Sequence, residues 1–81
     1  MFSIYPVPAI HDIHVITLDF PSEGTRFEII DASGKLALSV PLTSASSVIS
    51  VAHIAKGNYI ARVISPEKRY GEQKFTVIRE Y

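Results

Sequence analysis

Short runs of alternating apolar and polar residues, separated by turn formers at even intervals, constrain the fold of this chain more than any other feature. Phe27 and Ile29 alternate with Arg26 and Glu28, and residues 58–65 show the same period of two. Successive side chains of a strand point to opposite faces, so each run has one buried face and one solvent face. The pattern predicts half-buried antiparallel strands.

The turn formers divide the chain into about seven such runs, at a spacing of about 8–12 residues. Strands are expected over residues 2–5, 12–18, 25–31, 35–41, 47–51, 58–65 and 72–79. No segment offers a capped helix of three turns, although "VAHIAK" could form a single helical turn. We therefore expect an all-β fold, an Ig-like antiparallel β-sandwich of about seven short strands.

Alternation also assigns the buried face of individual strands. Leu36, Leu38 and Val40 should share one face, opposite the polar or small residues between them. In the last strand Phe75 and Val77 should share the buried face.

Two glycine-containing turns have predictable geometry. In "DASGK" the Asp31 carboxylate should accept hydrogen bonds from backbone amides ahead of it, and Gly34 should take the left-handed position of a hairpin turn. Gly57 should supply a positive φ or a close approach between strands. Tyr59 should then enter the next strand as a core anchor whose hydroxyl bonds to the backbone.

Size and composition exclude several classes of protein. The 81 residues are enough for one domain, and we expect residues 1–81 to be a single domain excised from a longer chain. Eight basic residues balance eight acidic ones, which argues against a nucleic-acid partner. Without cysteine there is no disulfide, thiol nucleophile or cysteine metal site. The sequence contains no apolar run of about 18 residues, so we expect no direct membrane insertion.

The residue types that carry catalysis do not form a recognisable pattern. His11 and His14 lie an odd number apart, so one strand sends them to opposite faces, and a metal site would also need His53 and a carboxylate. The serines of residues 44–50 lack a GxSxG elbow. The sequence therefore predicts no catalytic, cofactor-binding or metal-ligating residue, and no enzyme.

Four segments, in this order, carry a family resemblance. They are "IYPVPA" (4–9), "FEIIDASGKLAL" (27–38), "ISVAHIAKGNYIARV" (49–63) and "EQKFTVIRE" (72–80). Together they resemble the C-terminal sorting domains of the type IX secretion system of Bacteroidetes. The chain departs from the family pattern at Val7, where asparagine is usual, after Ala9, and at its Glu80–Tyr81 end.

The resemblance implies an Ig-like, non-catalytic signal at the C-terminus of a secreted protein. Such a domain crosses the periplasm folded, is recognised by the outer-membrane translocon and its shuttle protein, and is commonly removed by a surface sortase that attaches the cargo to the cell surface. Carried over by position, the residues implied in partner recognition are Gly34, Lys35, Gly57, Tyr59, Lys74, Phe75, Val77, Ile78 and Arg79. The exposed amides of a terminal strand suit strand addition by a partner.

Three alternatives remain open at this point. The domain could be retained as an Ig-like module for envelope-partner binding or signalling. It could be a carbohydrate-binding accessory sandwich of a bacterial hydrolase that uses Tyr5, Tyr70 or Tyr81 for stacking. An exposed edge strand would also permit a homodimer.

Overall fold

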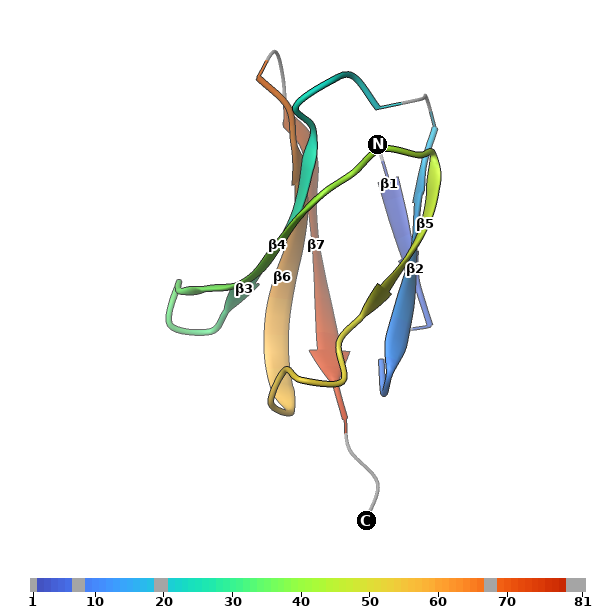
Figure 1. The fold of residues 1–81 in the computed structure, drawn as a ribbon. Coiled ribbons are helices and arrows are strands. Elements are labelled where there is room, and N and C mark those ends of the chain that lie inside the picture. Colours follow the sequence, from blue (N-terminus) through green and yellow to red (C-terminus); the bar gives the residue numbers. More distant parts are fainter. Residues whose placement is uncertain (1, 7–8, 19–20, 67–68, 79–81) are drawn as a thin grey trace.

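The computed structural model describes residues 2–6, 9–18, 21–66 and 69–78, and in these ranges every regular element is a strand (Figure 1). The strands are β1 (Phe2–Tyr5), β2 (Asp12–Thr17), β3 (Arg26–Asp31), β4 (Leu36–Pro41), β5 (Ser46–Ser50), β6 (Gly57–Ile64) and β7 (Arg69–Val77). A helix long and apolar enough to cross a membrane is not found in the described ranges.

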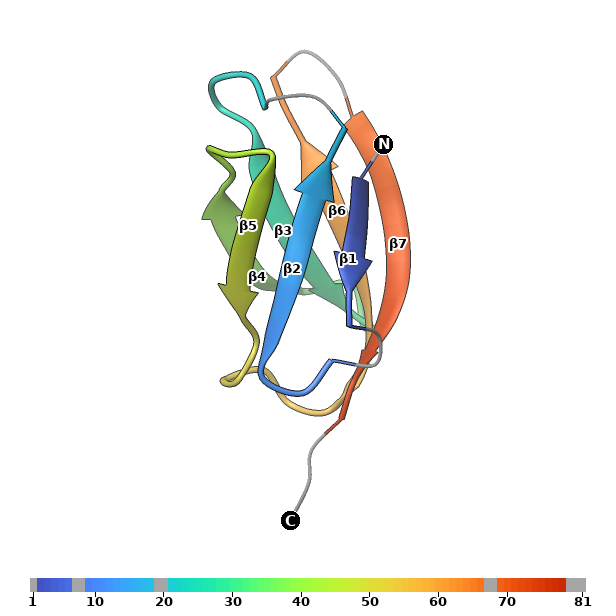
Figure 2. The same cartoon turned by 90° about the vertical axis from the view of Figure 1, so that its right-hand side faces the viewer.

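The strands form two sheets that pack face to face. One has three strands in the order β1-β2-β5, and the other has four in the order β4-β3-β6-β7, with neighbouring strands antiparallel in both (Figure 2). Two layers of antiparallel strands are the arrangement that the alternating pattern predicts. The prediction of an all-β, Ig-like sandwich of about seven strands is confirmed.

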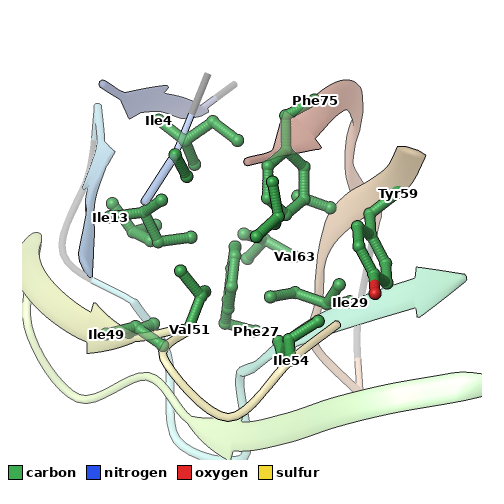
Figure 3. Packing of buried hydrophobic residues seen from close by; sticks show 14 of the residues in the cluster. Ile4, Ile13, Phe27, Ile29, Ile49, Val51, Ile54, Tyr59, Val63 and Phe75 are labelled. Atoms are coloured by element: carbon green, nitrogen blue, oxygen red, sulfur yellow. The ribbon is translucent and has the colours of Figure 1, made fainter. Parts of the chain in front are cut away.

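The core lies between the two inner faces. Ile4 and Ile13 of the three-stranded sheet face Phe27, Val63 and Phe75 of the four-stranded sheet (Figure 3). Ile13, Phe27 and Val63 are completely buried. These side chains occupy alternate positions of their strands, so the period of two in the sequence is the period of burial.

Six strands lie within one residue of their predicted bounds, and β7 differs more. It begins at Arg69, three residues before the predicted start, because the turn in "SPEKRYGE" is shorter than expected. The pairing of β6 with β7 shifts register between Val63 and Ile64, opposite Gly71, which has φ +123°. A bulge that contains glycine lets the strand continue through this irregularity. The predicted end at residue 79 lies outside the described residues.

The prediction that Leu36 shares a buried face with Leu38 and Val40 is wrong. Leu38 and Val40 pack against the core, but Leu36 is 53% exposed. The register of β3 with β4 pairs Ile29 with Leu38 and Ile30 with Leu36, which leaves out the residue between the two leucines. This bulge turns Leu36 to the outer face, beside Ile30.

The turn between β3 and β4 has the predicted geometry. Oδ1 of Asp31 accepts hydrogen bonds from the Ser33 amide at 2.9 Å, the Ser33 hydroxyl at 2.7 Å and the Lys35 amide at 2.9 Å. Gly34 has φ +90°, as a hairpin turn requires. The Ser33 hydroxyl, followed by the Lys35 amide, lowers the pKa of Asp31 below 3.8, because these bonds favour the charged carboxylate.

The entry to β6 also follows the prediction. Gly57 has φ +154°, and Tyr59 is 8% exposed, with its hydroxyl donating to the Ala55 carbonyl. The preceding segment "VAHIAK" is a turn and not a helix, with the Ile54 amide donating to the Val51 carbonyl at 3.1 Å. Tyr59 therefore anchors β6 to the connection before it.

The two adjacent isoleucines of β3 provide a matched test of the assigned faces. We expect Ile29→Val to lower the free energy of unfolding by about 0.5–1.5 kcal/mol, because a buried methyl group is lost. Ile30→Val, on the outer face, should lower it by less than about 0.5 kcal/mol. Urea denaturation measures both, and equal losses would contradict the assignment.

The turn carboxylate makes the stability depend on pH. Because folding lowers the pKa of Asp31, its stabilisation is complete above pH 3.8 and is lost as the pH falls through the lower folded pKa. Asp31→Ala should therefore reduce the urea midpoint at pH 6, and the gap to wild type should narrow below pH 3.8. Asp31→Asn keeps an acceptor oxygen without the charge and serves as the control. A gap for Asp31→Ala that does not change with pH would refute this role.

Candidate partner-recognition surface

The last strand lies at the rim of the four-stranded sheet. β7 is the final strand in the order β4-β3-β6-β7 and pairs with β6 along its whole length (Figure 2). Phe75 is 3% exposed and Val77 is 1% exposed, and the Phe75 ring lies 5.9 Å from that of Tyr59. These inward side chains fix the strand in place, so they are not themselves available to a partner.

A segment from the other end of the chain covers the last part of this edge. Ala9 makes a parallel bridge with Val77, and its amide donates to the Thr76 carbonyl at 2.8 Å. The Ile78 amide in turn donates to the Ala9 carbonyl at 2.8 Å. Ala9 is completely buried. The expectation that the terminal strand exposes its amides is therefore wrong for Ile78, because a non-local pairing occupies that amide.

Farther back along β7, at Lys74, no backbone hydrogen bond to this edge is found among the described residues. Backbone groups of a strand alternate in direction, and the bonds to Ala9 show that Thr76 and Ile78 direct theirs away from β6. Lys74, two residues before Thr76, therefore also directs its N–H and C=O away from β6. Its side chain is exposed on the outer face of the sheet. Among the described candidate residues, Lys74 presents both its outward backbone groups and its side chain to a partner.

A groove of about 570 Å³ lies on the outer face of the same sheet, next to Lys74. The turn between β3 and β4, which projects away from the three-stranded sheet, contributes to its wall (Figure 1). The lining residues are Ile30, Asp31, Ala32, Gly34, Asn58, Tyr59, Ile60, Lys74, Phe75 and Thr76. Four of the nine candidate residues line the groove, Gly34, Tyr59, Lys74 and Phe75, but the side chains of Tyr59 and Phe75 are buried in the core, so Gly34 and Lys74 are the exposed ones.

The other candidate residues lie elsewhere. Lys35 and Gly57 are neighbours of the groove in sequence but do not line it. Val77 is in the core and Ile78 is bonded to Ala9, whereas Arg79 is outside the described residues. The candidate set therefore divides between structural positions and one accessible surface.

Sequence reasoning missed the floor of the groove. Ile30 and Ile60 are half-buried residues on the outer faces of β3 and β6, and they are directly paired. The available signal was an apolar residue at a position that alternation assigns to solvent, in "FEIID" and again in "NYIARV". Only the register of the two strands shows that they lie side by side.

A polar network occupies the neighbouring part of the outer face. Nε of Arg62 donates to Glu28 at 2.9 Å, and the Ser39 hydroxyl donates to the same carboxylate at 3.4 Å. Nε of Arg26 donates to the Ser39 oxygen at 2.9 Å. The network links β4, β3 and β6: Arg62 pairs with Glu28, and the Ser39 hydroxyl lies between Glu28 and Arg26.

The sequence also offers tyrosines for carbohydrate stacking and histidines for a metal site. Tyr5 is half exposed, and its ring stacks on that of His14, with centroids 4.8 Å apart and 7° between the planes. The side chains of Tyr70 and Tyr81 lie outside the described part of the structure. Within that part, no three His, Cys, Asp or Glu residues gather where they could hold a metal ion. Of the three tyrosines, only Tyr5 therefore has a described side chain, and its ring is already stacked on His14.

Comparison with known proteins agrees with the motifs. The family model of the secretion system C-terminal sorting domain matches residues 3–78. No curated protein and no solved structure matches the chain. The match includes all seven strands except the first residue of β1, together with both glycine turns. The chain therefore belongs to the family of type IX secretion system C-terminal sorting domains.

Proposed function

We propose that residues 1–81 are a non-catalytic export and sorting signal carried by a longer secreted protein. The match to the sorting-domain family over residues 3–78 carries this proposal. In it, the type IX translocon and its outer-membrane shuttle protein recognise the folded domain and deliver the attached cargo to the cell surface. A surface sortase then exchanges the domain for an anchor.

Recognition proceeds by strand addition at the open part of the β7 edge. The burial of Phe75 and Val77 supports this, because it anchors β7 at the rim of the sheet, and among the described residues no backbone hydrogen bond is found to the outward groups of Lys74. A partner strand gains main-chain hydrogen bonds from such an edge. The backbone of Lys74 supplies one donor and one acceptor. Ala9 restricts docking to the part of β7 that precedes Thr76.

A reporter fusion tests the sorting function. A secreted fluorescent protein followed by residues 1–81 should appear on the surface of a bacterium with a type IX system, as measured by protease accessibility on intact cells. In a strain with an inactive type IX translocon it should stay in the periplasm. Periplasmic retention of the fusion in the competent strain would refute the proposal.

Two variants at one position of the same fusion test strand addition. Lys74→Pro and Lys74→Gln both remove the ammonium group, but only proline also removes the outward N–H. Proline is tolerated where the N–H of an edge strand faces solvent, so the domain should still fold. We expect surface display of the proline variant to fall at least fivefold below that of the glutamine variant. Equal display, with circular dichroism showing two folded domains, would exclude strand addition at this residue.

A further inference from the structure

The outer face of the four-stranded sheet contains an apolar row that ends in a cation. Strand register places Leu36 beside Ile30, Ile30 beside Ile60, and Ile60 beside Lys74. Leu36 is 53% exposed, and Ile30 and Ile60 are half-buried. The outer face of an antiparallel sandwich normally carries polar residues, so three adjacent aliphatic side chains are an exception.

The neighbouring row shows which residue types the same sheet carries where its outer face contacts only water. Ser39, Glu28 and Arg62 pair across β4, β3 and β6, and their polar groups bond to one another. Strand formation therefore does not require aliphatic residues on this face. The apolar row also lies where the turn between β3 and β4 forms a groove over Ile30 and Ile60.

The polar groups around the groove determine which sign of charge a ligand should carry. The Asp31 carboxylate is used by its own turn, where it accepts three hydrogen bonds. Among the residues that the structure describes, no hydrogen-bond or ion-pair partner is found for the Lys74 ammonium. Asn58 accepts the Thr76 hydroxyl at its side-chain oxygen, at 3.1 Å, so its amide nitrogen remains a donor. The end of the groove at Lys74 therefore presents hydrogen-bond donors beside an apolar floor.

We infer that this row binds an extended segment of a partner protein whose side chains are aliphatic and whose last residue places a carboxylate on Lys74. From Leu36 to Lys74 the row crosses three inter-strand steps of about 4.8 Å, which is about 14 Å. An extended chain covers that distance with about four residues. The identity of the partner as a component of the secretion machinery rests on the proposed sorting function, but the chemistry of the segment does not.

Charge fixes the direction in which the segment lies. An acidic residue at the Lys74 end meets an exposed ammonium group, and opposite charges at adjacent positions of a sheet attract. At the other end, the side chains of Leu36 and Ile30 provide no donor, and the Lys35 ammonium next to Leu36 already interacts with the Asp31 carboxylate. That carboxylate lines the groove and repels a second one. A segment with a basic last residue would place two cations together at Lys74.

Peptide titration of the isotope-labelled 81-residue chain tests the inference. The probe is acetyl-Ser-Val-Leu-Val-Glu-Ser-amide, and the control peptide has lysine in place of glutamate. The acidic peptide should shift the backbone amide signals of Ile30, Ile60 and Lys74 in the two-dimensional NMR spectrum, and bind at least fivefold more tightly than the basic one. Lys74→Glu should reverse that preference.

Three outcomes of the titration would overturn the inference. They are no shifts at millimolar peptide, equal affinity for the two peptides, and shifts confined to β7 without Ile30 and Ile60. The last would indicate addition to the strand edge alone.

A matched pair of variants connects the groove to export. Ile60→Thr keeps a β-branched residue but removes apolar surface from the floor, and Val48→Thr makes the same kind of change at an exposed position of the other sheet. In the surface-display assay Ile60→Thr should reduce display at least threefold and Val48→Thr should not. Full display of Ile60→Thr would overturn the role of the groove in export while leaving the sorting function intact. If the wild-type fusion is not displayed, the sorting function is refuted. The peptide titration would still show whether the groove binds the acidic segment.

Discussion

The burial of Phe75 and Val77 is the constraint on which the rest of the structure depends. These two side chains fix the inner face of β7 against the core, and β6 satisfies one of its edges. The other edge is then held in an extended conformation, and Ala9 is the backbone partner found for it among the described residues. A strand that lost this anchoring would fray, and a partner would have to order it before pairing, which costs conformational entropy. The core therefore preorganises the surface that a translocon component would meet.

The segment around Ala9 gives this edge a defined end. Ala9, bonded through its amide and its carbonyl, protects the last part of β7 from unrestricted edge-to-edge pairing. The covered part and the open part differ in chemistry as well. The covered part adjoins the buried Val77, whereas the open part includes the exposed Lys74 and borders the apolar groove. One strand thus combines a protected end with an accessible stretch.

The sequence predicts those features that depend on local pattern. Alternation assigns the inward face of β7 through Phe75, and glycine and aspartate chemistry accounts for the turns. It fails where a bulge changes the register, as at Leu36 and Gly71, because a bulge depends on how two distant strands pair. The bond of Ala9 to β7 and the position of Ile60 beside Lys74 are likewise non-local. The fold can therefore largely be predicted from the sequence, whereas the accessible surface cannot.

Amide hydrogen exchange, followed residue by residue along β7, tests the central claim most directly. The account predicts slow exchange at Phe75, whose amide faces β6, and at Ile78, whose amide donates to Ala9. It predicts fast exchange at Lys74, whose amide points outward between them. A Lys74 amide as protected as those of Phe75 and Ile78 would mean that the edge is already occupied, and the account of an open recognition strand would fail.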